Sequence, residues 1–319
     1  MPDTPLTVTI AIPTYRRAAL LRQTLEGLVR QDYPPEQLEI LIIDNNSPDE
    51  TRAVVEAFSG ARHVPRYLLE TQQGANFARN RAIAEARGEV IVFGDDDILI
   101  GPEWVREIVR PFAENPPGRV GAVGAVGGEV IPVFPEGCPP WVAGFHGPQA
   151  FRTDAGPLRA GQVPMSASLA FLRRTFGELG GFDTTVGRKG SVIFGGDENL
   201  AIRRLLQAGY EVWFAPAARA QHQMPASRTT LRYVRKHAFD SARSRVVGRL
   251  REDRETGRSS AGYLVSRWIG NVLKAAGFAG LAALSFVVLR PDAGRQNLVR
   301  AWRSCGYLYQ IARSATGRV

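Results

Sequence analysis

Three consecutive carboxylates, Asp95, Asp96 and Asp97, follow the apolar run Glu89-Val-Ile-Val-Phe93. Adjacent carboxylates repel one another unless a cation or hydrogen-bond donors offset their charge. Side chains alternate along an extended strand, so Asp95 and Asp97 point one way and Asp96 the other. Hard oxygen ligands suit Mg²⁺ or Mn²⁺, and a diphosphate can supply the remaining ligands. The triplet therefore predicts a divalent-metal site, and the alternative is a solvated acidic loop at the start of a helix.

A strand must deliver these carboxylates to a ligand, and the N-terminal part of the chain alternates between strand-like and helical patterns. Three apolar runs end in the polar loops Pro13-Thr14-Tyr15, Asp44-Asn45-Asn46 and Asp95-Asp96-Asp97. This alternation predicts an α/β fold with a doubly wound, mainly parallel sheet and helices on both faces. Because ligands bind at the carboxyl ends of such strands, we expect the three loops to form one site.

The remainder of the chain changes character after the helix that follows the triplet. Residues 116–161 are rich in Gly and Pro and predict irregular loops with short strands. A helix is predicted from Asp197 to Ala208, ending at Gly209, and a strand from Tyr210 to Phe214. Beyond Thr229 we expect a basic helix to Leu250, a charged linker over 251–262, an apolar segment over 263–289 and a basic amphipathic helix over 293–312.

Charge divides the chain into two parts. Residues 1–218 hold 21 Lys and Arg against 26 Asp and Glu, a net charge of −5, whereas residues 219–319 hold 19 against 5, a net charge of +14. Aromatic residues are not interleaved with these arginines as a stacking surface for nucleic acid requires, so we expect no nucleic-acid partner. We expect the chain to divide into an N-terminal domain over 1–225 and a basic helical region over 226–319.

The apolar stretch Ala275–Leu289 lies within the basic part of the chain and carries no charge. It contains 15 residues, fewer than the ~20 that a spanning helix needs. Together with the flanking cations it predicts a region that associates with an anionic membrane surface. A buried helix that closes the C-terminal region is the alternative, and whether 268–289 spans, lies on or avoids the membrane stays open.

The N-terminus and the cysteines indicate a cytoplasmic protein. Met1 to Ile10 has no positively charged region before its apolar run, and Tyr15-Arg16-Arg17 ends that run too early for a secretory signal. The two cysteines, Cys138 and Cys305, form no C-x-x-C pair and are expected to be free thiols. We expect a peripheral position on the inner face of the cell membrane.

Five groups of residues, in order, resemble the family 2 glycosyltransferases with their GT-A fold. They are Val8-Thr-Ile-Ala-Ile-Pro-Thr-Tyr-Arg-Arg17, Leu41-Ile-Ile-Asp-Asn-Asn-Ser47, Gly74-Ala-Asn-Phe-Ala-Arg-Asn-Arg81, Phe93-Gly-Asp-Asp-Asp97, and Gly180-Gly-Phe-Asp183 with Gly195-Gly-Asp-Glu-Asn-Leu-Ala-Ile-Arg203. The resemblance covers most of residues 7–225. It implies an inverting enzyme that moves a sugar from a nucleotide-diphosphate donor, with a UDP-sugar favoured. The acceptor would be a hydroxyl of a saccharide or a lipid-linked acceptor in cell-envelope or polysaccharide biosynthesis.

The resemblance also implies roles for individual residues. Tyr15 and Asp44 would hold the nucleobase, and Arg79 would donate to the diphosphate. The metal ligands, for Mn²⁺ or Mg²⁺, would be Asp97, Asp95 and His222. The full donor-binding set is Pro13, Thr14, Tyr15, Asp44, Asn76, Arg79, Asp95 and Asp96.

The general base of the resembling family lies in an E-D-x-D-L pattern at a helix N-terminus. The matching segment here is Gly196-Asp-Glu-Asn-Leu200. Alignment of Leu200 places Asp197 on the base position. Gly196 and Asn199 depart from the pattern, so Glu198 stays an alternative base, and N-terminal charge compensation of the helix is a non-catalytic reading of both acids.

Other functions keep some support from the residues. A nucleotidyltransferase also combines such a sheet with a carboxylate-bound metal, although the loop after Ile12 has no glycine before Gly27 for a phosphate loop. A non-catalytic sugar- or nucleotide-binding module would need the same donor pocket but no base. Trp104 and Trp141 are candidates to stack on a sugar ring, with core packing as the alternative.

Overall fold

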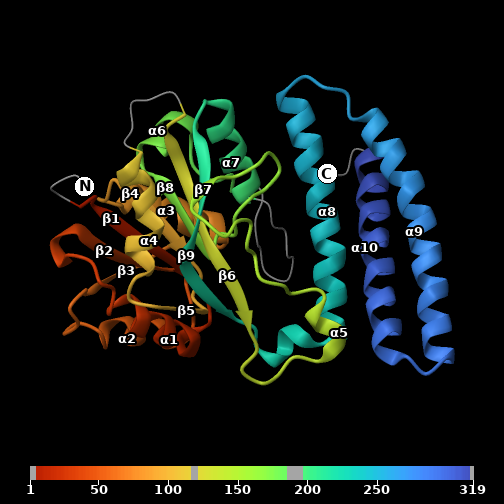
Figure 1. Ribbon diagram of the computed structural model, residues 1–319, viewed down its shortest axis with the longest axis horizontal. Helices are drawn as coiled ribbons and strands as arrows, with labels where there is room; N and C mark the ends of the chain where they lie inside the picture. The colour runs from red at the N-terminus through yellow and green to blue at the C-terminus, as the bar shows by residue number, and fades with distance from the viewer. Residues whose placement is uncertain (1–4, 116–120, 185–196, 317–319) are drawn as a thin grey trace. The chain divides into compact units, whose positions relative to one another are not determined.

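The computed structural model describes residues 5–115, 121–184 and 197–316. These residues form two compact units (Figure 1). The first unit contains the described residues up to Val133, from Pro148 to 184 and from Asp197 to Gln223. The second contains Phe134–Gly147 and the described residues from Met224 onwards.

The described part of the first unit holds a nine-stranded sheet in the order β3-β2-β1-β4-β8-β6-β9-β5, with β7 paired to β9. Strands β1 to β4 are mutually parallel, and so are β6 and β9, whereas β8 runs antiparallel to β4 and β6, and β5 antiparallel to β9. This mixed, mostly parallel sheet confirms the predicted α/β architecture. The strands are β1 (Val8–Thr14), β2 (Leu38–Asp44), β3 (Pro65–Leu69), β4 (Val90–Gly94), β5 (Ile98–Ile100), β6 (Val123–Val133), β7 (Gly156–Pro157), β8 (Ser168–Leu172) and β9 (Glu211–Gln223).

Helices cover both faces of this sheet, which explains why its central strands are almost continuously apolar. In β1, Ile10 and Ile12 join the hydrophobic cluster that includes α1, α2 and α4. Ala11, between them, joins the cluster that includes α3, α6 and α7 on the other face. The helices of this unit are α1 (Ala18–Leu28), α2 (Thr51–Glu56), α3 (Ala75–Glu85), α4 (Trp104–Glu114), α6 (Arg174–Leu179) and α7 (Asp197–Gln207).

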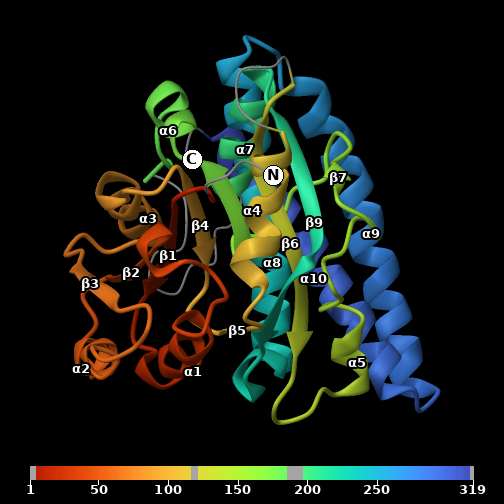
Figure 2. The ribbon, with the colours of Figure 1, turned by 60° about the vertical axis from the view of Figure 1, so that its left-hand side comes forward.

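The glycine- and proline-rich middle of the chain is predicted to form irregular loops with short strands, and for Val123–Val133 the structure has one long strand instead. These 11 residues form β6, which runs beside the long β9 (Figures 1 and 2). Its glycines are sites of close approach: a Cβ at Gly127 would overlap Pro164, and one at Gly128 would overlap the carbonyl oxygen of Ala218. Glycine therefore permits tight packing here rather than a loop.

Strand β9 continues well beyond the predicted end at Phe214 and reaches Gln223. It does so because it pairs with β6 along one edge and with β5 along the other. In the antiparallel pairing with β5, His222 lies opposite Ile98, the residue that follows the acidic triplet. The length and register of β9 therefore bring His222 to the carboxylates.

The second unit is helical, with η2 (Ala226–Thr229), α5 (Pro140–Ala143), α8 (Leu231–Glu255), α9 (Ala261–Val287) and α10 (Pro291–Ala315). Helix α10 packs against both α8 and α9. The predicted linker over 251–262 is shorter than expected, because α8 continues to Glu255. Ion pairing between Arg249 and Asp253 at 3.0 Å, one turn apart, supports the helix in this charged segment.

The contact between α8 and α10 yields a stability prediction. A Cβ at Gly306 of α10 would overlap the backbone carbonyl oxygen of Phe239 in α8. Gly306→Ala should therefore lower the free energy of unfolding by about 1–3 kcal/mol, because the two backbones must separate. Gly248→Ala in α8 is the matched control, since nothing lies within 4 Å of the added Cβ. It should raise stability by roughly 0.5–1 kcal/mol.

Thermal or denaturant unfolding of both variants measures the difference. Equal stability of the two glycine variants would contradict the close packing of α10 on α8.

Candidate active site

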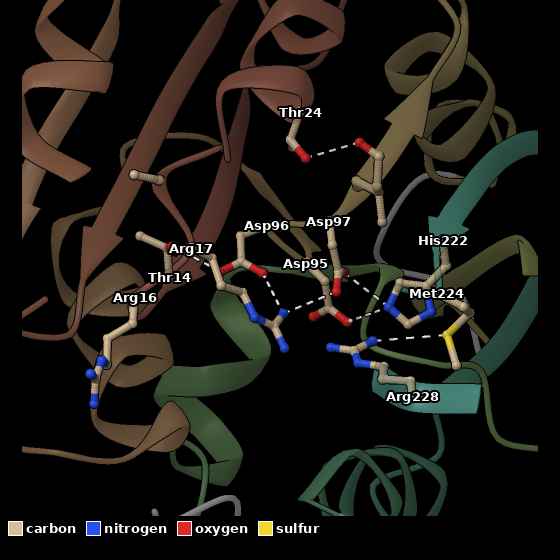
Figure 3. A network of polar contacts seen from close by, with 12 residues as sticks. Thr14, Arg16, Arg17, Thr24, Asp95, Asp96, Asp97, His222, Met224 and Arg228 are labelled. Atoms are coloured by element: carbon tan, nitrogen blue, oxygen red, sulfur yellow. Dashed lines mark hydrogen bonds and ion pairs between the residues drawn. The ribbon is translucent and has the colours of Figure 1, made fainter. Parts of the chain in front are cut away.

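The acidic triplet forms the turn between β4 and β5 (Figure 3). Its three carboxylates lie in different environments: Asp96 and Asp97 are buried, whereas Asp95 is partly exposed. A buried carboxylate is costly without compensating charge, so the neighbours of this turn determine whether it is stable.

Asp95, Asp97 and His222 form a cluster that can hold a metal ion. The Nε2 atom of His222 lies 2.9 Å from a carboxylate oxygen of Asp97 and 3.9 Å from one of Asp95. One ligand atom from each residue lies within 4.8 Å of the other two. Two carboxylates and an imidazole are suitable donors for a divalent ion such as Mn²⁺. The predicted metal ligands are therefore brought together, and their chemistry fits the ion.

Asp96 points to the opposite side of the turn, where Arg17 and Thr14 meet it (Figure 3). Nη1 of Arg17 donates to Asp96 at 2.8 Å and to Asp97 at 2.9 Å. The hydroxyl of Thr14 donates to the other oxygen of Asp96 at 2.8 Å. Arg17 therefore supplies a fixed positive charge that bridges two of the three carboxylates.

The pKa directions follow from this arrangement. Burial raises the pKa of Asp96, and the nearby Arg17 guanidinium opposes that rise. Burial lowers the pKa of Arg17, but the charges of Asp96 and Asp97 outweigh it and raise that pKa above its usual value. Arg17 therefore stays protonated at any physiological pH.

Sequence reasoning missed Arg17, which it treated only as part of the polar end of the first strand. The available signal was the pair Arg16-Arg17 in a loop at the carboxyl end of β1. The pair does not reveal which arginine turns inward. Arg16 has a positive φ of 57° and is exposed, and its side chain points away from the triplet (Figure 3).

The predicted nucleobase residues lie at the ends of the two neighbouring strands β1 and β2. Pro13 pairs with Ile43 across the ladder, and Thr14 with Asp44. Asp44 is buried and accepts hydrogen bonds from the Tyr67 hydroxyl at 2.7 Å and from a backbone N–H. Burial and then the Asp44 carboxylate raise the pKa of Tyr67 to about 12, so this hydroxyl keeps its proton and orients Asp44. Tyr15, by contrast, is 42% exposed, and the Arg16 guanidinium lies 5.9 Å from the centre of its ring.

Asn76 and Arg79 lie on α3, and both are buried. The Asn76 side chain donates to the backbone carbonyl of Asp183 at 2.8 Å, and Arg79 donates to Asn76 at 2.9 Å and to Ser166 at 3.2 Å. The guanidinium also lies 3.9 Å from the Glu198 carboxylate. Arg79 is thus positioned by protein groups, next to one of the two candidate bases.

A neighbouring residue on α3, Asn80, also holds the segment before Asp183. Its amide donates to the carbonyl of Phe182 and accepts from the N–H of the same residue, each at 2.8 Å. Sequence reasoning included Asn80 in a quoted segment but gave it no role. Only the fold shows that it fixes a loop about one hundred residues away.

The candidate bases lie at the start of α7. Asp197 is the first residue of the helix, but its side chain lies outside the described part of the structure, as do Gly195 and Gly196. Glu198 is partly exposed and near Arg79. The position of Glu198 beside Arg79 is compatible with its role as the alternative base. The prediction that Asp197 is the base stays a prediction.

The two tryptophans considered for sugar stacking are core residues. Trp104 is 1% exposed and donates from Nε1 to the Ser168 hydroxyl at 3.0 Å. Trp141 is 6% exposed and belongs to a hydrophobic cluster of the second unit. Both tryptophans therefore pack in hydrophobic clusters, which was the alternative interpretation to stacking on a sugar ring.

Comparison with known proteins identifies relatives for this arrangement. Residues 9–153 match the family described as glycosyl transferase family 2. The chain is 27% identical over 257 residues to glucosyl-dolichyl phosphate glucuronosyltransferase of Haloferax volcanii, covering 75% of this chain and 76% of that protein. It is 26% identical over 303 residues to the succinoglycan biosynthesis protein ExoM of Rhizobium meliloti, covering 93% and 89%.

Solved structures share the fold. The mannosyltransferase PcManGT from Pyrobaculum calidifontis, in complex with GDP-Man and Mn²⁺, superposes with a TM-score of 0.59 at 19% identity, covering 97% of this chain and 88% of that one. TarS of S. aureus in complex with UDP superposes with a TM-score of 0.54 at 16% identity, covering 98% and 92%. The sheet order and these superpositions confirm the predicted GT-A fold.

The Arg17 bridge yields a prediction with a defined pH dependence. Arg17→Gln should lower the free energy of unfolding at neutral pH by about 1–3 kcal/mol, a discounted value because the arginine side chain is 32% exposed. Without Arg17 the folded-state pKa of Asp96 rises further above its unfolded value. The folded variant then binds a proton more readily than the unfolded chain, so the deficit shrinks as the pH falls through that pKa.

Denaturant unfolding in metal-free buffer, at neutral and at mildly acidic pH, measures this deficit. Arg16→Gln is the matched control and should have little effect at either pH. A deficit for Arg17→Gln that is unchanged or grows in acid would disprove the bridging role.

Proposed function

We propose that this chain, which belongs to glycosyl transferase family 2, transfers a sugar from a nucleotide-diphosphate donor, with a UDP-sugar favoured, to an acceptor hydroxyl. The observation that carries the proposal is the cluster of Asp95, Asp97 and His222 beside Arg17, at the carboxyl ends of the parallel strands. A diphosphate needs such a combination of metal ligands and fixed positive charge.

The donor would lie across the strand ends of the first unit. We assign Tyr15 and Asp44 to the nucleobase, with Tyr67 holding Asp44 in place through their hydrogen bond. Pro13 and Thr14 would line the pocket with their backbone. Asn76 and Arg79 would act at the diphosphate end, and Asp96 would act on the donor through its bonds to Thr14 and Arg17.

Asp95, Asp97 and His222 would hold the cation, Mn²⁺ or Mg²⁺, whose charge offsets that of the diphosphate leaving group when it is bound. Asp97 has the strongest claim to direct ligation because it is fully buried and faces the imidazole. The permanent charge of Arg17 lowers the cost of holding several carboxylates in one turn.

Transfer would be a single displacement with inversion. Asp197, with Glu198 as the alternative, accepts the proton of the acceptor hydroxyl, whose oxygen attacks the anomeric carbon. The bond between that carbon and the diphosphate oxygen breaks, and the nucleoside diphosphate leaves with the electron pair. No covalent sugar intermediate forms on the protein.

The site residues assigned above concern the donor, and the class of acceptor is proposed from the relatives. The names of the two relatives above concern a lipid-linked sugar and a polysaccharide, so we propose a saccharide or lipid-linked acceptor in cell-envelope or polysaccharide biosynthesis. Residues 1–225 would form the catalytic domain, and residues 226–319 would associate with the inner face of the cell membrane.

A screen of nucleotide sugars with and without Mn²⁺ tests the activity. A protein that binds donor but neither transfers nor hydrolyses it would be the alternative binding module, and formation of a nucleotide sugar from a sugar phosphate would indicate the alternative nucleotidyltransferase.

The metal site yields one prediction. Asp97→Ala should abolish transfer and weaken donor binding measured calorimetrically in Mn²⁺, because it removes a buried ligand. Asp32→Ala is the matched control, since that aspartate is 65% exposed and pairs only with Arg106 among the described residues. It should leave both measurements unchanged. Full activity of the wild-type protein in EDTA would falsify metal dependence.

The base yields a second prediction. Asp197→Asn keeps the shape of the side chain but removes its ability to accept a proton. Turnover should fall by roughly 10²-fold or more, with donor affinity nearly unchanged. Glu198→Gln is the paired variant. If it causes that loss while Asp197→Asn does not, the base is Glu198, which lies 3.9 Å from Arg79.

A further inference from the structure

Helix α9 presents apolar side chains outward along most of its length. By length and composition it is long and apolar enough to cross a membrane, and 11% of its most apolar 18-residue window is buried. Its only charged residues are Arg267 and Lys274. A helix that faces water normally turns its polar residues outward. The exposed apolar face, hereafter the outer face of α9, consists of Val265, Ile269, Val272, Leu273, Leu281, Leu284 and Val287.

The inner side of α9 is occupied by α10, which runs antiparallel beside it. Four contacts define the register of the two helices. Near the start of α9, Leu264 packs with the cluster of Tyr307 and Ile311, and the Arg267 guanidinium lies 5.9 Å from the centre of the Tyr307 ring. Further along, the Arg300 guanidinium lies 5.8 Å from the centre of the Phe278 ring, and Gly294 faces the ring of Phe286. The paired positions run from one end of α9 to the other. Figure 1 shows the two helices side by side.

The register between α9 and α10 distinguishes a membrane-spanning helix from a helix that lies parallel to the membrane surface. Helix α10 carries Arg295, Arg300, Arg303 and Arg313. If α9 crossed a bilayer, Arg300, opposite Phe278, would enter the hydrocarbon core together with Lys274 of α9 itself. Each such charge costs on the order of 2.5–3.5 kcal/mol near the centre. Helix α9 can therefore enter the membrane only with its outer face, parallel to the surface.

The three long helices also gather arginines around Tyr307. Arg245 of α8 donates to the Tyr307 hydroxyl at 3.4 Å, and Arg267 of α9 lies over the ring. Arg303 lies one turn before Tyr307 on α10, and burial and then the charge of Arg245 lower its pKa. Among the described residues, none of these three arginines has a carboxylate within 4.0 Å. This set, hereafter the arginine cluster, lacks a counter-anion that phosphate headgroups can supply.

Charge complementarity selects the occupant of the outer face. Residues 219–319 carry a net charge of +14, and from 256 to 291 the sequence has no Asp or Glu. A second copy that packed through the same outer face would bring an equally cationic surface against the first. An anionic lipid surface offers both an acyl region for the outer face and phosphates for the arginines.

We propose that α9 is an in-plane membrane helix, with its outer face in the acyl boundary and the arginine cluster on phosphate headgroups of anionic lipid. The inference rests on the membrane association included in the proposed function, and it specifies the face, the lipid chemistry and the orientation.

Vesicle flotation tests the face and the charge. Full-length protein should float with phosphatidylcholine vesicles that contain phosphatidylglycerol and much less with phosphatidylcholine alone. Leu273→Glu with Leu284→Glu should reduce binding about tenfold or more, because both side chains must leave the acyl region. Arg245→Gln with Arg303→Gln should remove the preference for phosphatidylglycerol. Val64→Glu with Leu206→Glu is the control, since these residues of the first unit are 56% and 48% exposed. It should float like the wild type.

Circular dichroism and thermal unfolding confirm that each variant is folded. If the Leu273 and Leu284 variant floats as well as the wild type, the outer face does not contact lipid. If the wild type does not float, and the same variant converts a dimer to a monomer in sedimentation, the occupant is a second copy and the proposal is wrong.

Spin labels on the outer face test the orientation. Single cysteines at Val265, Leu273, Leu284 and Val287, in a chain with Cys138→Ser and Cys305→Ser, report depth in vesicles. An in-plane helix gives similar, shallow depths at all four, whereas depths that pass through a maximum near the middle of α9 indicate a spanning helix and overturn the proposal. Donor turnover with a soluble acceptor is measured separately. Protein that floats but is inactive contradicts only the transferase function, and active protein that never floats contradicts only this inference.

Discussion

Electrostatic repulsion among three carboxylates in one turn is the constraint on which the first unit depends. Asp96 and Asp97 are buried in that turn, where an uncompensated charge is far more costly than in water. The compensating charge comes from a residue distant in sequence, Arg17 in the loop after β1, and the end of β9 places Nε2 of His222 2.9 Å from Asp97. Bound cation would complete the compensation. The same repulsion that makes the turn unfavourable by itself favours a bound cation there, and in the proposed function that cation would in turn attract the diphosphate.

The sheet supplies this compensation through the arrangement of its strands. Parallel pairing of β1 with β2 and β4 places three loops at one edge, so Arg17 reaches the triplet from an adjacent strand. Strand β9 runs in the same direction as β4, as the pairings of β8 and β6 show, and its antiparallel pairing with β5 places His222 opposite Ile98, next to the triplet. A second layer of contacts, from Asn76 and Asn80 to the backbone of residues 182–183, ties α3 to the loop that precedes the candidate bases. The site therefore depends on long-range pairing more than on any single motif.

The two units differ in net charge. The first is net acidic and places three carboxylates in one turn, and the second is strongly basic with an apolar outer face on α9. A transferase that uses a lipid-linked acceptor benefits from this division. In the proposed function, the basic unit would hold the enzyme at the membrane surface, where a lipid-linked acceptor is concentrated.

The sequence by itself predicted the strands β1 to β4 with their polar ends, and it proposed the candidate site residues other than Arg17 and Asn80. An apolar run such as Val90–Gly94, followed by three aspartates, can be recognised locally because both faces of a parallel strand are buried. Only the tertiary structure decided that Arg17 rather than Arg16 turns inward, that β6 forms in a stretch rich in glycine, and that Arg79 lies beside Glu198. These outcomes depend on which distant segments pair and in which register, and local periodicity carries no information about contacts between residues so far apart in the chain.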